Sequence, residues 1–551
     1  MNRADIRKKT VQVASSTMLS RLLGLAREVL MANYLGVGPL ADAFLTAFKI
    51  PNSLRKVFAE GALSAALLPS FVAENAQNDK KAVNSLMTLS MMIFEGILCI
   101  VCLVIFWKAE TIIRFIVPGW YCVVQPPATF SLFGIPFIDQ TIGSCVAFLS
   151  TTQPSQQALL AVSFLRILIS FILFLSMSAL LASALQSVHR FFVPAFGQVL
   201  INVIFITGIL VCISYQLPVT YLCFFILLSG IAQFVWHLIA YFNAGFSFGP
   251  IEDSTWSAMK KVLHKFIPCL LSMSVMELLL FVSTSVASFL PAGSISLIYY
   301  ANRFMGIPLG VFSRAFSTVL FPSFARVGTY AHRRLSFYLY EAAKLIFWVM
   351  VPVSLMFAFV AHKLFLTLFL SNKFTLANVQ EAGTILMIFV IGLFFFSLNH
   401  ILLNLYYALH ETRIPLIISC VVLATDLLLS YFVLMPLFGA TGIALATVIV
   451  SALQTALFAY GLYYFFGFTF YGTAFAQFAA KSLLQCALVS GLFLILYYAL
   501  IGIISMSFGS SAPMFLNSLI FWVWFIPLAG IFFGILFKTR KLFGIKLYFL
   551  E

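Results

Sequence analysis

Long apolar runs separated by short polar segments make up most of the chain, and each run is about 20–30 residues long. A run of this length matches an α-helix that crosses the hydrocarbon core of a bilayer, whereas barrel strands would alternate over about ten residues. The pattern therefore predicts an all-α polytopic membrane protein with fourteen spans. Their expected ranges are 11–34, 39–73, 83–107, 157–186, 191–213, 219–242, 262–289, 296–325, 337–360, 382–408, 415–435, 440–465, 482–504 and 515–537.

Composition supports this class and excludes several functions. Apolar residues form 62% of the 551 residues and charged residues 9%, whereas soluble proteins are usually about 25% charged. The N-terminus lacks a small-residue cleavage site, so no cleavable signal is expected. The sequence shows no P-loop and no cluster of His and Cys, and the nine cysteines are scattered. We therefore expect no cofactor, no metal and no ATP hydrolysis, and a transport role rather than an enzyme.

The net charge of +15 follows the topology of the chain rather than a nucleic-acid surface. With the N-terminus in the cytoplasm, Lys and Arg gather on the cytoplasmic side, as the positive-inside rule requires. Both termini are then cytoplasmic. The opposite side holds only Lys108, Arg114, Lys363 and Lys373. The nineteen cytoplasmic residues are Arg3, Arg7, Lys8, Lys9, Lys80, Lys81, Arg190, Lys260, Lys261, Lys265, Arg326, Arg333, Arg334, Arg413, Lys481, Lys538, Arg540, Lys541 and Lys546.

One further stretch, 130–150, is long enough to span the membrane. Counting it as a span would reverse every later loop and leave eight basic residues inside against fifteen outside. It also contains Gly134, Pro136 and Asp139. We therefore expect a re-entrant or surface hairpin on the outer side.

An internal repeat divides the chain. The segment "GALSAALLPSF" (61–71) matches "RAFSTVLFPSF" (314–324) at six positions, and six spans separate the copies. An even number gives both copies the same direction, so the expected arrangement is two six-helix lobes related by a pseudo-two-fold axis along the membrane normal. The predicted parts are an N-terminal lobe, a cytoplasmic linker, a C-terminal lobe and two additional helices, at 1–245, 246–258, 259–470 and 471–551.

Basic residues inside the predicted spans are the main functional signal. A central arginine costs about 2.5–3.5 kcal/mol on insertion scales, so such groups normally face a hydrated cavity or a partner. Lys49, Arg166, Arg314 and Lys344 are expected to reach the headgroups from span ends. Arg21 and Arg27 lie deeper, about 120° apart on an ideal helix, and Gly24 between them is expected to let the helix bend.

Acidic residues are too few to neutralise this charge. Asp42 and Glu60 flank Arg55 in the second span, and Arg303 has no acidic neighbour in its span. Guanidinium groups without partners predict an anion site, because arginine forms forked contacts with phosphate or carboxylate.

The segment "SRLLGLAREVLMANYLGVGPLADAFLTAFKIPNSLRKVFAEGALSAALLPSF" (20–71) resembles the N-terminal signature of the MurJ (MviN) family of lipid II flippases, within the multidrug/oligosaccharidyl-lipid/polysaccharide exporter superfamily. The resemblance continues through "HRFFVPAFGQVLIN" (189–202), "YYANRFMGIPLGVF" (299–312) and "FGATGIALAT" (438–447). It implies a flippase that moves the undecaprenyl-diphosphate-linked peptidoglycan precursor to the outer leaflet of the bacterial cytoplasmic membrane. It also makes the cell-wall synthesis machinery a candidate partner.

The resemblance also implies site residues. The essential cavity arginines of the family fall on Arg21, Arg27, Arg55 and Arg303, and its acidic position in the second span falls on Asp42. Ser20, Glu60 and Asn302 are expected to support the site. Two departures are Asn302, where the family often has an acidic residue, and a longer outer hairpin at 119–156.

With no nucleotide site, the expected driving force is a Na⁺ or H⁺ gradient, the membrane potential or product removal. The candidates for a cation site are Asp426, assisted by Thr447, and Glu277. We expect the last two spans to hold the lipid tail, with simple packing as the alternative. Two other functions stay open: an exporter of another polyprenyl-diphosphate glycan of the O-antigen type, and a membrane-embedded glycosyltransferase.

Overall fold

A computed structural model describes residues 3–76, 80–121, 154–313, 332–409, 411, 413–509 and 515–550. These residues are almost entirely helical, and within them the only β pairing is one isolated bridge between Ser371 and Phe374. The predicted all-α class is confirmed. The chain forms two compact units, Met1–Ser296 and Leu297–Glu551. The lobe boundaries expected from the repeat remain a prediction.

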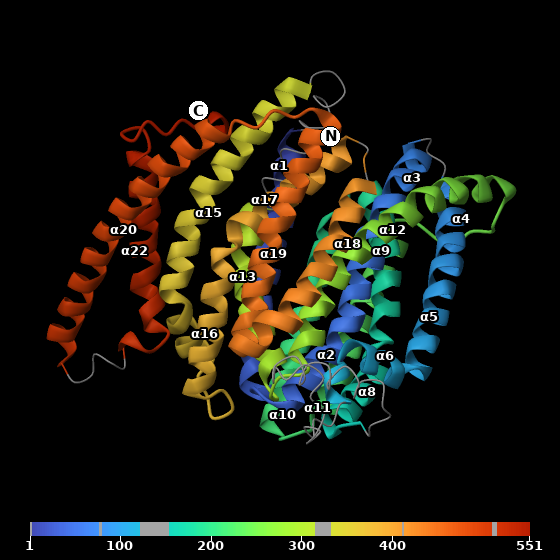
Figure 1. Ribbon diagram of the computed structural model, residues 1–551. Coiled ribbons are helices and arrows are strands. Elements are labelled where there is room, and N and C mark those ends of the chain that lie inside the picture. The colour runs from blue at the N-terminus through green and yellow to red at the C-terminus, as the bar shows by residue number, and fades with distance from the viewer. Residues whose placement is uncertain are drawn as a thin grey trace, which may run out of the picture. The chain divides into compact units, whose positions relative to one another are not determined.

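The first unit is built from helices along its described residues (Figure 1). In chain order they are α1 (Arg3–Leu35), α2 (Pro39–Leu54), the π-helix η1 (Arg55–Leu63), α3 (Ser64–Ala76), α4 (Lys80–Ser90), η2 (Met91–Glu95), α5 (Gly96–Trp107), α6 (Ala109–Ile116), η3 (Pro118–Trp120), α8 (Gln156–Leu168), α9 (Phe171–Ser187), α10 (Phe192–Ser214), α11 (Val219–Asn243) and α12 (Asp253–Ala287). Helix α13 (Ser294–Pro308) begins at the end of this unit.

The second unit has the same character (Figure 1). Its further elements are η4 (Leu309–Ser313), α15 (His332–Leu368), α16 (Leu376–Ile391), α17 (Leu393–Ala408), α18 (Arg413–Leu428), η5 (Leu429–Leu434), α19 (Met435–Phe466), α20 (Gly472–Phe508), α22 (Ile520–Thr539) and η7 (Tyr548–Leu550).

Within the described residues, eight helical stretches are long and apolar enough to cross a membrane, or nine if α16 and α17, bent by 47° at their junction, form one span. Helices α1 and α2, which carry the predicted site residues Arg21, Arg27 and Asp42, are not among them. The exact number of fourteen spans therefore stays a prediction. The structure supports a multi-pass membrane protein.

The longest apolar stretch, Arg413–Phe466, has 54 residues. As one straight helix it would be about 80 Å long, far more than the ~30 Å hydrocarbon core. Gly439, with φ 59° and ψ −133°, interrupts the helical geometry, and α18 packs against α19. These features support two separate spans here, as the apolar pattern predicts.

Local sequence explains the geometry of the second span. Gly36 adopts a positive φ of 74°, which ends α1, and Pro39 then occupies the first turn of α2. Pro51 within α2 lacks the N–H that a helix interior requires, and the chain changes to a π-helix at Arg55. The side chains after Leu54 therefore point in directions that a continuous α-helix would not give them.

Each unit has its own apolar core. In the first unit, Phe94 of η2, Tyr241 of α11 and Phe266 of α12 pack in one buried cluster. In the second, Trp348 of α15, Phe493 of α20 and other side chains from α15, α20 and α22 form another. The expected outer hairpin at 130–150 and the second copy of the repeat at 314–324, with Arg314, lie outside the described residues.

Candidate functional site

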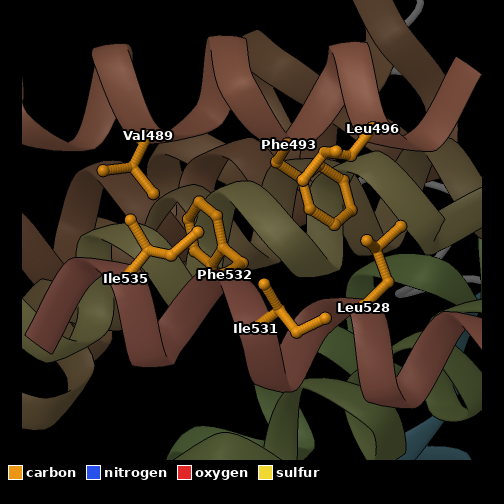
Figure 2. Close-up of a pocket in the computed structure, with 7 residues that line it drawn as sticks. All are labelled: Val489, Phe493, Leu496, Leu528, Ile531, Phe532 and Ile535. Atoms are coloured by element: carbon orange, nitrogen blue, oxygen red, sulfur yellow. The ribbon is translucent and has the colours of Figure 1, made fainter. Parts of the chain in front are cut away.

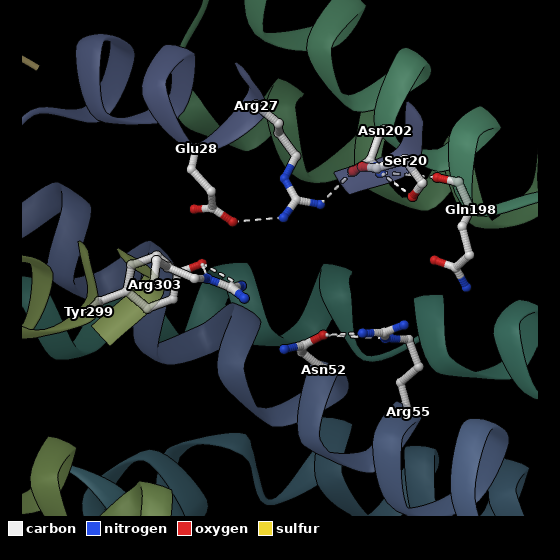
Figure 3. Close-up of polar contacts among 9 residues, drawn as sticks. All are labelled: Ser20, Arg27, Glu28, Asn52, Arg55, Gln198, Asn202, Tyr299 and Arg303. Atoms are coloured by element: carbon white, nitrogen blue, oxygen red, sulfur yellow. Dashed lines mark hydrogen bonds and ion pairs between the residues drawn. The ribbon is translucent and has the colours of Figure 1, made fainter. Parts of the chain in front are cut away.

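Three neighbouring side chains contact the guanidinium of Arg27. Its Nη2 donates to Oε1 of Glu28 at 2.7 Å, and its Nη1 donates to Oδ1 of Asn202 on α10 at 3.0 Å (Figure 3). Its Cζ lies 5.0 Å from the ring centroid of Phe205, one helical turn beyond Asn202. The arginine side chain is 16% exposed. It is therefore fixed on three sides without being sealed from its surroundings.

Donor capacity remains on this guanidinium. Arginine has five N–H donors, and the contacts with Glu28 and Asn202 use two of them. Among the described residues, the buried Nε of Arg27 has no hydrogen-bond partner. A planar donor fork with unused N–H groups suits a phosphate or carboxylate oxygen.

The other two predicted arginines of the first unit are placed differently. Arg21 is exposed, and α1 runs through Gly24 without a break. Arg21 shares none of the contacts that hold Arg27, as their angular separation predicts. Arg55 donates from Nε and Nη2 to Oδ1 of Asn52, at 3.2 and 3.1 Å (Figure 3). Glu60 lies in η1, but its side chain is outside the described part.

Asp42 contacts backbone rather than arginine. Its carboxylate accepts from the N–H of Gly293 at 2.6 Å and of Ser296 at 2.8 Å, and from the side chain of Gln157 at 3.3 Å. The side chain is buried, with 2% exposed. Because two of these donors lie at the start of α13, where helix N–H groups lack internal partners, Asp42 joins α2 to that helix end. Its predicted role in orienting an arginine receives no support from these contacts.

Arg303 belongs to the second unit. It is exposed and donates from Nε and Nη2 to the hydroxyl of Tyr299, at 3.1 and 2.8 Å, with its Cζ 5.0 Å from that ring (Figure 3). Asn302 precedes it on α13 and is half-buried. The expected convergence of Arg303 with the arginines of the first unit remains a prediction.

The candidate cation ligands have distinct surroundings. Glu277 pairs with Lys56 at 3.0 Å and accepts from the Ser53 hydroxyl at 2.8 Å. Asp426 is buried, and its Oδ1 accepts a hydrogen bond from the Ser430 hydroxyl at 3.4 Å. Thr447 donates to the backbone carbonyl of Ile443, one turn back on its own helix, at 3.0 Å.

Two lysines expected to reach the headgroups contact oxygen acceptors within the protein. Lys344 is buried, pairs with Glu341 at 2.8 Å and lies 5.2 Å from the Tyr340 ring. Lys49 donates to Thr284 of α12. Each ammonium group thus has a close oxygen acceptor within the protein, and the expectation that it reaches the headgroups stays a prediction.

Gln485 fastens the last two helices to α15. It is fully buried, donates to the carbonyl of Leu536 at 2.7 Å and to the Thr539 hydroxyl at 2.8 Å, and accepts from Nε1 of Trp348 at 3.0 Å. One amide thus contacts α15 and α22 from its position on α20. The C-terminal segment adds a contact, because the N–H of Tyr548 donates to Glu341 at 3.3 Å.

Replacing Gln485 with leucine is expected to lower the stability of the protein by about 1–2 kcal/mol, because three hydrogen bonds in a buried site lose their partner. The change should appear as a lower unfolding temperature in detergent. The exposed Gln380→Leu variant on α16 is the control. An unchanged unfolding temperature for Gln485→Leu would show that the amide does not join these helices.

A small apolar pocket lies between α20 and α22, and its side chains point toward one another (Figure 2). Aliphatic and aromatic side chains line it. The lining residues are Val489, Phe493, Leu496, Leu528, Ile531, Phe532 and Ile535.

Sequence reasoning missed Asn202 as a partner of Arg27. It ends the segment "HRFFVPAFGQVLIN", so the resemblance included it, but an asparagine in an apolar helix carries no charge to draw attention. A polar amide within a span is itself the signal that could have found it, because such a group requires partners inside the protein.

The family model described as "Lipid II flippase MurJ" matches residues 31–151 and 128–516. The "Probable lipid II flippase MurJ" of Haemophilus influenzae is 30% identical over 455 residues, which cover 81% of this chain and 83% of the relative. The "Lipid II flippase MurJ" of Burkholderia cenocepacia is 30% identical over 460 residues, with 82% of each chain covered.

Solved structures show the same fold. A structure titled "Lipid II flippase MurJ, inward closed conformation" superposes with a TM-score of 0.70 at 22% identity, over 97% of this chain and 98% of that one. An inward-facing multidrug resistance MATE family transporter of the MOP superfamily gives a TM-score of 0.64 at 15% identity, over 82% and 97%. With the family model matching most of its length, the chain belongs to the MurJ lipid II flippase family.

Proposed function

We propose that this protein is a flippase that moves lipid II from the cytoplasmic to the outer leaflet of the bacterial cytoplasmic membrane. The observation that carries the proposal is family membership, since the relatives that it matches over four fifths of its length are named lipid II flippases. The intramembrane arginines provide the chemical support. The protein is a transporter under this proposal and catalyses no covalent step.

The diphosphate of the substrate is the part that needs the arginines. Arg27 offers unused N–H donors on a guanidinium already fixed by Glu28 and Asn202. Arg21, Arg55 and Arg303 are proposed to contribute further positive charge to the same hydrated cavity. An anion enters such a cavity favourably because guanidinium groups form charge-assisted, forked hydrogen bonds with phosphate oxygens.

The polyprenyl tail has different needs. It is apolar and never has to leave hydrocarbon during translocation. We propose that it lies along α20 and α22, where many large apolar side chains are exposed. The Gln485 contacts would keep this helix pair attached to α15 while the tail occupies it.

Alternating access supplies the movement. The superposing structures include inward-facing and outward-facing conformations of MATE family transporters of the MOP superfamily, which supports a fold that opens to each side in turn. Asp42 is proposed to stabilise one of these states, because its two backbone contacts join α2 to the start of α13. Breaking them would be one cost of changing state.

A cation or the membrane potential would bias the cycle. One charge that crosses 100 mV is worth about 2.3 kcal/mol, which shifts a two-state equilibrium about 50-fold. Asp426 is the preferred cation ligand, because it is buried in an apolar helix and no described basic residue pairs with its carboxylate, which accepts a long hydrogen bond from Ser430. Glu277 is the weaker candidate, since Lys56 already neutralises it.

Asp426→Asn is therefore expected to remove the response of flipping to an imposed Na⁺ or H⁺ gradient, because the amide keeps the shape but loses the charge. The measurement is the flipping rate in liposomes with and without each gradient. Glu277→Gln is the matched control and should keep the response. A full response in the Asp426 variant would exclude this residue as the coupling site.

Reconstitution tests the function as a whole. Purified protein in liposomes with labelled lipid II should make the label accessible in the opposite leaflet, faster than protein-free liposomes do. A parallel sample with an O-antigen-type undecaprenyl-diphosphate glycan distinguishes the related exporter function. Movement of that glycan without movement of lipid II would reject the proposal.

A further inference from the structure

Asn202 presents a neutral oxygen to Arg27, and the surrounding contacts fix which way its amide faces. Its Nδ2 donates to the Ser20 carbonyl at 3.1 Å, the Ser20 hydroxyl at 3.2 Å and the Gln198 carbonyl at 3.1 Å. A flipped amide would set its oxygen against two carbonyl oxygens and its NH₂ against the guanidinium. The hydrogen-bond network therefore assigns Oδ1 to Arg27.

Two helices cooperate in this arrangement. Ser20 and Arg27 are seven residues apart on α1, close to two full turns, so they share the face that packs against α10. On α10, Asn202 and Phe205 are three residues apart and also share a face. The Asn202 amide thus contacts α1 twice (Figure 3). Its Nδ2 donates to Ser20, and its Oδ1 accepts from Arg27 on the same face of α1.

The two partners of Arg27 differ in charge. Glu28 at 2.7 Å holds the guanidinium and also reduces its positive field. Asn202 holds the other Nη and leaves the charge intact, because an amide carbonyl is a dipole without net charge. A second carboxylate at this position would neutralise the group that is proposed to receive the diphosphate.

We propose that Asn202 is a positioning residue, which fixes the donor fork of Arg27 for a diphosphate without consuming its charge. This role adds detail to the proposed function, and it rests on that function for the class of ligand, a diphosphate. Orientation matters most for a ligand that accepts two parallel N–H groups, so the loss of Asn202 should impair a diphosphate more than a monophosphate.

The test uses full-length protein in detergent, with farnesyl diphosphate and farnesyl monophosphate as probes and farnesol as the uncharged control. Asn202→Ala is expected to weaken farnesyl diphosphate binding about tenfold and the monophosphate about twofold or less. Asn399→Ala is the matched control. Asn399 is similarly buried, on α17, and bonds Ser451 and Thr455 rather than an arginine.

A double-mutant cycle separates positioning from simple packing. In the wild-type background Arg27→Lys is expected to weaken diphosphate binding about tenfold, because an ammonium lacks the fork. In the Asn202→Ala background the same change should weaken binding only about twofold, since the fork is already free to turn. A structural role for Asn202 would give additive losses.

Four outcomes would overturn the inference: wild-type protein that does not bind farnesyl diphosphate, wild-type affinity in Asn202→Ala, additive losses in the cycle, or an equal loss of affinity in Asn399→Ala. The flipping assay with lipid II is measured separately. Protein that shows the expected binding pattern but moves no lipid II would reject the proposed function and leave the role of Asn202 supported.

Discussion

Replacing Arg27 with glutamine is expected to abolish lipid II flipping while the protein still inserts and folds. Loss of a partly buried guanidinium removes charge-assisted hydrogen bonds to the substrate, which together are worth about 3 kcal/mol, or about 100-fold in affinity. The check is the leaflet-accessibility assay in liposomes, normalised to the amount of folded protein by size-exclusion chromatography. Arg27→Lys should retain part of the activity, since it keeps the charge but not the fork.

Two further variants identify the cause of any loss. Arg27→Gln leaves the Glu28 carboxylate without its cation, so the double variant Arg27→Gln/Glu28→Gln removes that carboxylate charge as well. If the arginine itself contacts the substrate, the double variant stays inactive. Recovery of flipping in the double variant would show instead that the unpaired Glu28 carboxylate caused the loss. Arg190→Gln, at an exposed position between α9 and α10, should keep wild-type activity.

Replacing Arg303 with glutamine is expected to have an effect of similar size, although this arginine lies in the other unit. Its guanidinium is exposed and is oriented by the Tyr299 hydroxyl. Tyr299→Phe should therefore reduce flipping less, by about tenfold, because the charge stays while one orienting acceptor is lost. The same liposome assay measures both variants.

The double variant tests whether Arg27 and Arg303 bind the same diphosphate. Binding of farnesyl diphosphate is measured for Arg27→Gln, Arg303→Gln and the double variant. Residues that contact the same ligand group give a loss in the double variant that differs from the sum of the single losses. Strictly additive losses would place the two arginines at separate sites and contradict the shared cavity.

The apolar pattern predicted the helices well because bilayer thickness imposes a length on them. Helices α10 and α11 begin and end within one residue of the expected spans 191–213 and 219–242. The pattern also separated 415–435 from 440–465, where Gly439 interrupts the helical geometry. The π-helix that begins at Arg55 had no signal of its own beyond Pro51 nearby.

Residue type was enough to select candidate site residues, but it did not predict their contacts. Arginine within a span indicates an anion, and this holds without coordinates because the insertion cost is large. Sequence could not show that Asp42 would bind backbone N–H groups of the segment 293–296, more than 250 residues away. Nor could it show that Lys344 would be buried against Glu341.

The sequence by itself determined the membrane class, the helical architecture, the family and the short set of basic residues worth testing. Those conclusions depend on length, charge and local pattern, which are properties of the chain alone. Only the tertiary structure decided the partners: Asn202 beside Arg27, Lys56 on Glu277, and Gln485 between three helices. The physical reason is that hydrogen bonds reach only about 3 Å, so which distant groups meet depends on how the helices pack.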